Sequence, residues 1–519
     1  MSNREKRVGQ SLDTLSKEHL FEELYKILLT EPDRTHAELA SSVRRLTLPN
    51  GDVTERVERA SAAIREKFGA DGRFIGIDAP MAFDFLVLLW ATLRSGNKPF
   101  LMDRFGDRAK QEAALSRLEA AGIVACGVKP RTARPLLYWE TLPEDGGAER
   151  TDAAFGEEIA FLGADGESRV WNGEALAAAI DRVGYRLADG KKTPAKLLLA
   201  LSLTDEAGLS LYWQSVADGT AVAFSDDPSA EAVMRTARSL RATCLAATPA
   251  VWHGADRCLC RLLDGKDEKV RSKFDRCVAR GKVAPVSREL SEHLFGDTLR
   301  GGACFGGAVS DAARGRLCAV GYAVSDGAAS DATESETVIE RLLDLPLAEE
   351  WVAIAEAEGV YLVIRAREDL LSRQKQNLQH AVAACLGRLP AGVTVSEAWY
   401  TADPLSVSPA YGVDRAAIRE RIRGGRLGRL DFSGADEADG EESEIKAILR
   451  TMFADILGVG EDEISEDGHF MIDLGGSSLD YFTLVGEINE RFGINLGFEG
   501  DEFRYTLNDF ERAVKDLVR

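Results

Sequence analysis

Short apolar runs alternate with longer amphipathic stretches through most of the chain. Residues 73–79 (RFIGIDA) have the pattern of a strand, residues 82–96 (AFDFLVLLWATLRSG) that of a helix ended by Gly96, and residues 98–103 (KPFLMD) that of the next strand. The same order recurs further along the chain. Strands that alternate with helices predict α/β layers built on a largely parallel sheet.

The pattern changes near residue 340, where helix, hairpin and helix follow one another. The segments are residues 336–346 (ETVIERLLDLP), 350–366 (EWVAIAEAEGVYLVIRA) and 377–390 (NLQHAVAACLGRLP). They predict a small α+β unit. We therefore divide this larger part into a core of residues 1–320 and a subdomain of residues 321–423.

A compositional break separates these parts from the C-terminal end. Residues 424–440 (GGRLGRLDFSGADEADG) are rich in Gly and charge and have no apolar periodicity, which is typical of a flexible linker. Residues 444–459 then carry apolar side chains at helical spacing, and further helices are expected from Ser478 and over residues 506–518. Three helices in residues 441–519 predict a small all-α bundle.

Size and composition narrow the class of protein. A chain of 519 residues with 45 % apolar and 29 % charged residues suits a globular protein of two to four domains. Its longest apolar runs, residues 83–93 and 195–204, are shorter than the roughly 20 residues of a membrane-spanning helix, so we expect no membrane. The first residues lack a secretory apolar segment and the eight cysteines form no disulfide framework, which favours a cytoplasmic location.

The charge is strongly acidic and unevenly distributed. A net charge of −21 argues against a nucleic-acid partner, because binding to phosphates needs a basic face. Residues 441–519 contain 19 acidic and 7 basic residues, a net −12. Such a module suits basic partner surfaces, although a solvated acidic face would have the same composition.

One motif in the acidic module carries specific chemistry. Residues 473–479 (DLGGSSL) resemble the signature D-L-G-G-x-S-L of acyl and peptidyl carrier domains, and the resemblance covers residues 441–519. In that family the serine before the last leucine receives a covalent 4'-phosphopantetheine from coenzyme A. The resemblance assigns this role to Ser478, with Ser477 in the variable position. The other motif residues are Asp473, Leu474, Gly475, Gly476 and Leu479.

Elementary chemistry agrees with this assignment. Two glycines allow a tight turn, and a serine at a helix N-terminus places its phosphodiester product at the positive end of the helix dipole. The nearby acids Asp480 and Glu487 would attract a basic transferase. The alternative is that Ser477 or Ser478 only caps the helix. A cap accounts for one serine but leaves the rest of the motif unexplained.

Four segments of the larger part resemble adenylate-forming enzymes, the family of acyl-CoA synthetases and adenylation domains of nonribosomal peptide synthetases. They occur in that family's order, at residues 73–128, 226–252, 299–310 and 403–422. The resemblance implies an α/β core with a small α+β subdomain, here followed by an all-α carrier bundle. The family joins a carboxylate to AMP and passes the acyl group to a thiol.

The phosphate-binding loop of that family is degenerate in this chain. A loop rich in Ser, Thr and Gly and ending in Lys would cradle the phosphates of ATP. The matching segment, residues 161–176, keeps Gly163 and Gly166, has Ser168 as its single hydroxyl, and offers Arg169 near the position of the lysine. Two further nucleotide motifs of the family, Y-G-x-T-E and T-G-D, are not found.

The hinge and the closing motif are also altered. Residues 321–340 resemble the family's hinge segment, with Ser325 or Asp326 near the hinge aspartate. In the closing motif, SPAYGVDR, Gly412 aligns with the catalytic lysine, or Tyr411 does if the register shifts by one. Loss of one preorganised donor typically costs about 10²- to 10³-fold in rate. We therefore predict a pseudo-enzyme, with a nucleotide site that has been dismantled.

Three hypotheses remain, and we favour them in this order. The chain is a carrier whose cargo is loaded by a separate adenylating or acyl-transfer enzyme and passed to a condensing or transfer enzyme, after modification by a phosphopantetheinyl transferase. It is, alternatively, an active ligase that uses ATP and Mg²⁺ to load its own carrier domain. The third hypothesis is a structural subunit with a vestigial tail. We expect no metal site, since His253, Cys258 and Cys260 do not have the spacing of zinc ligands.

Overall fold

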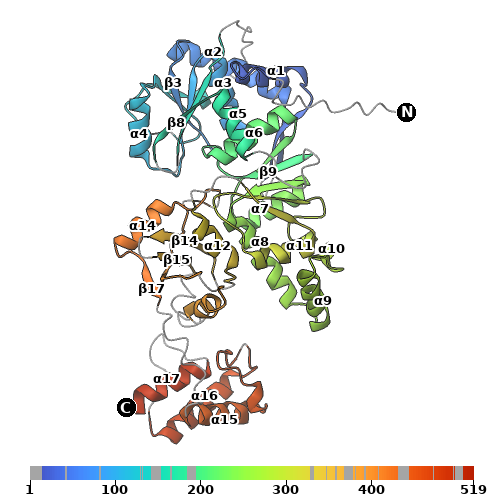
Figure 1. Cartoon of the computed structure of the whole chain (residues 1–519), viewed down its shortest axis with the longest axis vertical. Helices are drawn as coiled ribbons and strands as arrows, with labels where there is room; N and C mark the ends of the chain where they lie inside the picture. The colour runs from blue at the N-terminus through green and yellow to red at the C-terminus, as the bar shows by residue number, and fades with distance from the viewer. Residues whose placement is uncertain are drawn as a thin grey trace, which may run out of the picture. The chain divides into compact units, whose positions relative to one another are not determined.

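The computed structural model divides the chain into two compact units (Figure 1). One unit is Met1–Arg373 with Cys385–Leu430, and the other is Gln374–Ala384 with Asp431–Arg519. The structure describes residues 15–518 except 41–43, 81–82, 129, 131, 142–153, 164–165, 184–194, 328–331, 346–347, 357–358, 367–377, 380, 391–392, 407, 409, 431–443, 472, 495 and 497–505.

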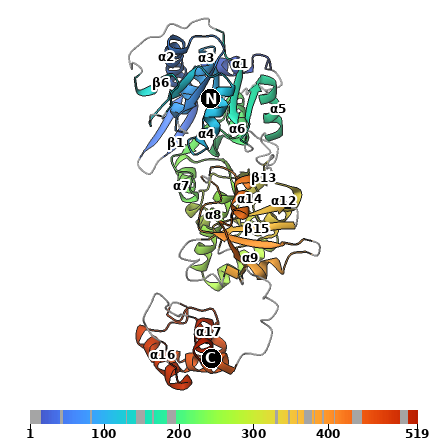
Figure 2. The same ribbon diagram turned by 90° about the vertical axis from the view of Figure 1, so that its left-hand side faces the viewer.

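The larger unit contains a six-stranded sheet with the order β6-β5-β3-β4-β7-β8. All of its pairs are parallel except the hairpin β7–β8, and β6 lies at one edge (Figure 2). The helices α3 and α4 connect β3 to β4 and β4 to β5, which confirms the strand–helix–strand order predicted for this region. The elements are β3 (Phe74–Asp78), α3 (Phe83–Arg94), β4 (Lys98–Leu101), α4 (Arg108–Arg117), β5 (Gly122–Ala125), β6 (Leu136–Tyr138), β7 (Glu158–Leu162) and β8 (Ser168–Asn172).

A second, seven-stranded sheet has the order β13-β12-β11-β9-β10-β1-β2 and is parallel except for β1–β2. The sequence predicts one parallel sheet, whereas the structure has two. The strands are β1 (Thr35–Ala40), β2 (Arg45–Pro49), β9 (Lys196–Ala200), β10 (Ala221–Ser225), β11 (Cys244–Ala247), β12 (Gly301–Cys304) and β13 (Ala323–Asp326). The helices of this region are α1 (Leu20–Thr30), α2 (Asn50–Phe68), α5 (Gly173–Val183), α6 (Glu206–Asp218), α7 (Ala230–Leu240), α8 (Pro249–Asp264), α9 (Glu268–Ala279), α10 (Ser287–His293) and α11 (Asp311–Val320).

Buried aromatic side chains from helices join the two sheets into one core. Trp90 of α3 and Trp213 of α6 are fully buried and meet edge to face, with ring centroids 4.6 Å apart. The same apolar cluster contains Ile75 of one sheet and Leu197 of the other. Edge-to-face contacts of this kind add to the gain from apolar burial.

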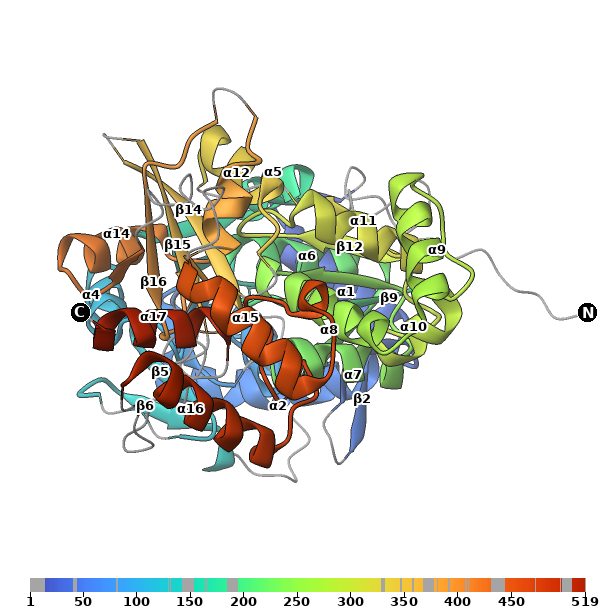
Figure 3. The same ribbon diagram turned by 90° about the horizontal axis from the view of Figure 1, so that it is seen from below.

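The small subdomain is a four-stranded sheet with the order β14-β15-β16-β17, with β14, β15 and β16 side by side in Figure 3. Its elements are α12 (Glu334–Leu342), β14 (Glu350–Glu356), β15 (Gly359–Arg365), β16 (Glu397–Thr401), α14 (Arg415–Arg423) and β17 (Gly428–Leu430). The predicted helix and hairpin are confirmed, whereas the predicted helix over residues 377–390 lies partly outside the described residues.

Two expected boundaries differ from the structure. The core does not end at residue 320, because β13 pairs with β12 inside the seven-stranded sheet. The linker does not begin at residue 424, because Gly428–Leu430 pairs with β16, where Leu430 lies opposite Ala398. Both short strands lack the length and the alternation that identify a strand in sequence.

The C-terminal unit contains the three predicted helices, α15 (Glu444–Leu457), α16 (Ser478–Phe492) and α17 (Leu507–Val518). Their apolar stripes meet in a core that includes Phe453, Phe470, Leu484 and Phe510. Phe453 makes edge-to-face contacts with both Phe470 and Phe510. The loop that precedes α16 is therefore attached to the bundle core through Phe470.

Candidate functional site

Ser477, and not Ser478, is the cap of α16. The Ser477 hydroxyl accepts a hydrogen bond from the backbone N–H of Asp480 at 3.2 Å. In return the Asp480 carboxylate accepts hydrogen bonds from the backbone N–H and the hydroxyl of Ser477, at 2.8 and 2.7 Å. This is a capping box, which satisfies two otherwise unpaired groups at the helix start. Ser478 is the first residue of the helix itself.

The motif residues before α16 form the turn that leads into it. The carboxylate of Asp473 accepts the backbone N–H of His469 at 2.8 Å, and Leu474 packs against the bundle core. Gly475 has a φ of +78°, which an L side chain rarely adopts. A Cβ on Gly476 would lie 2.4 Å from the ring of Phe470. The two positions therefore require glycine for different reasons. Gly475 adopts a left-handed backbone conformation, and Gly476 packs closely against Phe470.

The surface beside this turn is partly apolar and acidic. Leu479 and Phe482 of α16 are 74 % and 54 % exposed, and Glu487 is exposed on the same helix. The hydrogen bonds from Ser477 hold the pKa of Asp480 below its usual range, so this carboxylate is charged at neutral pH. Asp480 serves the helix cap, and its role in partner recognition stays a prediction, as does that of Glu487.

The candidate phosphate loop is a tight turn between β7 and β8. The N–H of Gly163 donates to the carbonyl of Glu167 at 2.8 Å, and the N–H of Gly166 donates to the carbonyl of Gly163 at 2.9 Å. Both groups are thus used inside the loop and are not directed at a phosphate. Ser168 pairs with β7 in the hairpin, and Arg169 lies 3.6 Å from a carboxylate oxygen of Glu206.

Tyr411, one of the two residues that align with the family's catalytic lysine, contacts the core. The hydroxyl of Tyr411 donates a hydrogen bond to Asp103 at 2.8 Å, and the carbonyl of Ala410 accepts the backbone N–H of Ser202 at 3.0 Å. Burial, and then the charge of Asp103, raise the pKa of Tyr411 above its ordinary value. Gly412 packs closely on the core, since a Cβ on Gly306 would lie 2.7 Å from its Cα.

These contacts lie at the carboxyl ends of both sheets. Asp103 follows β4 in the six-stranded sheet, and Ser202 follows β9 in the seven-stranded sheet. Open α/β sheets bind their ligands in the crevice outside the carboxyl ends of the strands. Tyr411 makes its hydrogen bond to Asp103 at this edge, and the N–H groups of Gly163 and Gly166 are bonded within their own loop. In this arrangement neither of these two N–H groups is directed at a phosphate of ATP.

The two hinge-like residues belong to a strand of the core. The hydroxyl of Ser325 donates to the carbonyl of Gly302 at 3.2 Å, across the β12–β13 pair. The carboxylate of Asp326 accepts hydrogen bonds from Arg314 at 2.5 Å and from Arg341. Both residues thus lie in the edge strand β13 of the seven-stranded sheet, and a hinge at these positions stays a prediction.

Sequence reasoning missed a buried ionic cluster where the subdomain meets the core. One oxygen of Glu340 accepts hydrogen bonds from Arg415 at 2.6 Å and from the N–H of Ala353 at 3.2 Å, and its other oxygen accepts the N–H of Ala308 at 3.1 Å. Arg415 is 1 % exposed, and its Nε lies 3.8 Å from Glu336. Burial raises the pKa of Glu340, and Arg415 opposes that effect. One partner could have been noted in the sequence, because Arg415 is the arginine of the closing motif SPAYGVDR.

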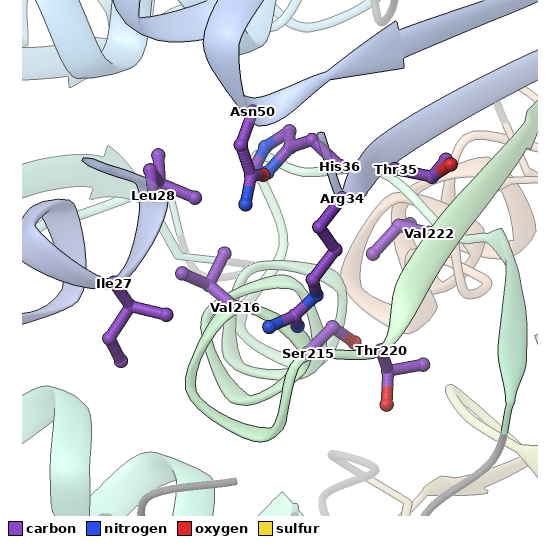
Figure 4. Close-up of a pocket in the computed structure, with 10 residues that line it drawn as sticks. All are labelled: Ile27, Leu28, Arg34, Thr35, His36, Asn50, Ser215, Val216, Thr220 and Val222. Atoms are coloured by element: carbon purple, nitrogen blue, oxygen red, sulfur yellow. The ribbon is translucent and has the colours of Figure 1, made fainter. Parts of the chain in front are cut away.

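A small polar cavity lies elsewhere, between α6, β1 and β10 (Figure 4). Its lining includes His36, Asn50 and Ser215, all buried, and its space of about 10 Å³ is close to the need of one water. His36 lies 2.9 Å from the hydroxyl of Tyr212, and burial lowers its pKa to about 4. This is a core polar network, too small for a substrate.

Among the residues that the structure describes, no group of three His, Cys, Asp or Glu side chains could hold a metal ion. His253, which is close to Cys258 and Cys260 in sequence, accepts the backbone N–H of Ser310 and stacks on Trp351. Over the same described residues, no helix combines the length and the apolar character required to cross a bilayer.

Comparison with known proteins gives the class to which these features belong. Residues 447–499 match the family model described as the phosphopantetheine attachment site. The match implies a covalent 4'-phosphopantetheine as the cofactor of the C-terminal unit, as the signature predicts. This segment includes both Ser477 and Ser478.

The fold of the whole chain has counterparts among solved structures. The adenylation–carrier didomain of a carboxylic acid reductase from Segniliparus rugosus, solved with AMP, has a TM-score of 0.58 at 11 % identity, over 97 % of this chain and 96 % of that one. The adenylation domain of a carboxylate reductase from Mycobacterium chelonae gives 0.57 at 12 %, over 78 % and 90 %. A benzoate CoA ligase from Burkholderia xenovorans gives 0.53 at 12 %, over 77 % and 99 %.

These similarities confirm the predicted fold class. The chain has the architecture of an adenylation domain, an α/β core with a small α+β subdomain, fused to a helical carrier domain.

Proposed function

We propose that this protein is a carrier that holds an acyl or aminoacyl group as a thioester on a phosphopantetheine arm attached to Ser478. The observation that carries the proposal is the capping box between Ser477 and Asp480. Because Ser477 satisfies the helix N-terminus, the cap does not require the hydroxyl of Ser478. A serine in the first turn of α16 also places its phosphodiester at the positive end of the helix dipole.

The attachment step is a phosphoryl transfer on the hydroxyl of Ser478. Its oxygen attacks the pantetheine-linked phosphate of coenzyme A, a P–O bond forms, and the nucleotide part leaves with the electrons of the broken anhydride bond. The hydroxyl proton goes to a base of the transferase. The surrounding acids, Asp480 and Glu487, give the basic transferase an electrostatic contact. The free thiol of the arm then accepts the cargo.

The adenylation-like unit does not, in this proposal, make acyl adenylates. The support is the position of Tyr411, hydrogen-bonded to Asp103 in the crevice where nucleotide binding would occur, together with the internal hydrogen bonds of Gly163 and Gly166. A lysine at position 411 or 412 would be needed to stabilise the transition-state charge. A separate adenylating or acyl-transfer enzyme loads the arm, and a condensing or transfer enzyme receives the cargo in a thiotemplated pathway. We assign this function to the cytoplasm.

The second candidate function is an active ligase that loads its own carrier domain. The adenylation fold favours it, and Arg169 is the cation that the family resemblance places near the position of the lysine. Its guanidinium is directed to Glu206, at 3.6 Å, which argues against a role in phosphate binding. The ligase hypothesis therefore requires both the Tyr411 segment and the phosphate loop to rearrange when ATP binds.

Intact mass spectrometry tests the carrier proposal. The full chain is incubated with coenzyme A and a broad-specificity phosphopantetheinyl transferase. We expect the wild type to gain the mass of one phosphopantetheine and Ser478→Ala to gain nothing. No gain in the wild type, or an equal gain in Ser478→Ala, contradicts the assignment.

Carboxylate-dependent pyrophosphate exchange distinguishes the two functions. With a panel of fatty, aromatic and amino acids, we expect no exchange above a protein-free control and no heat of ATP binding by calorimetry. Exchange with any member of the panel would establish the ligase function. The carrier assignment would not be affected by that result, because the mass measurement tests it separately.

A further inference from the structure

Helix α9 carries a stripe of basic side chains on a chain that is otherwise strongly acidic. Lys269, Lys273, Arg276 and Arg280 are separated by four, three and four residues, and all four are exposed. This spacing places them on one face of the helix, and Arg280, at its C-cap, continues the line. The stripe extends over about 16 Å at the helical rise per residue.

The four cations are not engaged by acids of their own unit. The described residues around α9 provide no ion pair for any of the four, although nearby Lys266 pairs with Glu289 at 2.5 Å. Arg276 donates only to the carbonyl of Ser272, within the same helix, at 3.1 Å. Like charges at a spacing of four residues destabilise a helix. The stripe therefore destabilises α9, and no ion pair among the described residues of the unit offsets this cost.

The apolar face of α9 explains why the helix stays folded. Phe274 is 1 % exposed and packs in the core cluster that includes Leu317 of α11. The helix lies at the outer margin of the unit, beside α10 and α11 (Figure 3). The basic stripe is thus fixed in geometry and faces solvent. Acids on the helix, such as Glu268 and Asp275, lie off the stripe.

We propose that α9 is a docking surface for an acidic helix of a partner protein. The spacing of four, three and four residues aligns the four cations along one side of α9, so a second helix lying alongside can present a row of charges to them. A partner helix with carboxylates at the same spacing would form a row of exposed ion pairs along the stripe. Such pairs contribute mainly to association rate and specificity, and their effect falls with ionic strength.

A helix suits this surface better than the common polyanions. Nucleic acids and anionic bilayers are extended, so they would also approach the rest of the protein. Because the chain has an overall charge of −21, they would be repelled there. The stripe is one line of four cations, with Arg271 exposed on another side of α9, and such a line matches the width of one helix. The charge outside the stripe then disfavours acidic partners that approach any other face.

The test uses the full-length chain and two synthetic helical peptides of identical composition. In one peptide, glutamates occur at the four-three-four spacing, and in the other they are distributed around the helix. We expect fluorescence anisotropy to show the first peptide binding about tenfold more tightly at low salt, the effect of four ordinary exposed ion pairs. Raising the salt from about 20 to about 300 mM should abolish this binding, because screening shortens the range of the interaction.

Charge reversal provides the matched variants. Lys273→Glu with Arg276→Glu should abolish binding of the first peptide, and Lys17→Glu with Lys67→Glu, which makes the same change in net charge at other exposed positions, should leave it unchanged. The reversal also creates favourable pairs within α9, so that helix should remain folded. The neutral pair Lys273→Gln with Arg276→Gln is the second variant, and should weaken binding to a smaller extent.

Each other outcome overturns the proposal. Equal binding of the two peptides would show that the spacing of carboxylates along the helix does not determine binding. Binding that persists in the reversed variant would place the site elsewhere, and absence of binding at low salt would leave the stripe without an acidic-helix partner. Tighter binding of anionic vesicles or of duplex DNA, lost on reversal, would assign the stripe to a bilayer or to nucleic acid.

Discussion

The phenol of Tyr411 donates a hydrogen bond to the carboxylate of Asp103 across 308 residues of sequence. Asp103 ends a strand of the six-stranded sheet, and Tyr411 belongs to the segment that precedes α14 of the small subdomain. The contact connects the core with the subdomain at the crevice where the sheets present their carboxyl ends. Tyr411, one of the two residues that align with the family's catalytic lysine, thus joins the small subdomain to the core.

Removal of that hydroxyl should destabilise the larger unit. Tyr411→Phe leaves the Asp103 carboxylate without one hydrogen bond in a half-buried place, and we expect a loss of about 1–2 kcal/mol in unfolding free energy. The seven tryptophans all lie between residues 90 and 399, so their fluorescence in urea reports on this unit. Tyr138→Phe, with a more exposed hydroxyl, should change the transition little.

The effect of Tyr411→Phe should also depend on pH. The pKa of Tyr411 is raised above its ordinary value of 10 by burial and then by Asp103. The contribution of the protonated phenol is therefore complete below pH 10 and is lost as the pH rises toward the folded-state value. We expect the difference between wild type and variant to shrink above pH 10. A difference that grows there would contradict the assigned contact.

The buried ionic cluster predicts a larger effect. Arg415→Met leaves Glu340 buried without its counter-charge, and breaking one partner of a buried pair costs about 3–5 kcal/mol. The control is Arg423→Met, because the side chain of Arg423 is 68 % exposed and its pair with Glu356 is worth at most about 1 kcal/mol. Urea unfolding followed by tryptophan fluorescence measures both.

A double variant separates the pair from the individual side chains. Glu340→Gln combined with Arg415→Met should cost less than the sum of the two single changes, because the second change removes the charge that the first left unpaired. Strict additivity would mean that the 2.6 Å contact between these side chains contributes no coupling.

Local patterns in the sequence were sufficient for the elements but not for their long-range pairing. The strand, helix and strand of residues 73–103 have clear periodicity, and the structure has them where predicted. Periodicity does not assign strands to sheets, so the division into two sheets was not predictable. The short strand β13 has the sequence AVSD, which resembles a loop, and Ser325 and Asp326 were expected near a hinge from the family resemblance of residues 321–340.

The candidate sites show the same division. The motif DLGGSSL indicates a carrier domain from seven adjacent residues, but only the structure decides which serine caps α16. The Tyr411–Asp103 contact and the Glu340–Arg415 pair join residues 308 and 75 positions apart. The sequence around one partner gives no information about the other. These pairs are strong because they are buried, and burial is a property of the folded chain.

The division of roles between the two serines is directly testable. Ser477→Ala removes the capping box and should weaken α16 by about 1 kcal/mol, the usual contribution of an N-cap serine. We expect faster amide hydrogen exchange in residues 478–492, while transfer of phosphopantetheine continues. Ser478→Ala should show the reverse, with normal exchange and no transfer. A folded Ser477→Ala chain that accepts no arm would contradict this division.

A buried histidine should make the larger unit sensitive to acid. Nε2 of His253 accepts the N–H of Ser310 at 3.1 Å, and its ring stacks on Trp351 with centroids 4.1 Å apart. Burial, and then Arg257, lower the pKa of His253 from 6.5 to about 3. The neutral ring therefore stabilises the fold fully above pH 6.5, and this stability is lost as the pH falls toward the folded-state value. The expected loss from this residue is about 2 kcal/mol between pH 7 and about pH 5.

His253→Gln keeps an acceptor for Ser310 but cannot take up a proton. It should be less stable than wild type at neutral pH, because the stacking on Trp351 is lost, yet its stability should fall less steeply in acid. His36, with a pKa that is lowered to about 4, remains in the variant and accounts for the residual slope. His293→Gln, at an exposed position, should keep the wild-type slope. Urea unfolding followed by tryptophan fluorescence at a series of pH values measures all three, and equal slopes for wild type and His253→Gln would show that His253 is not buried in its neutral form.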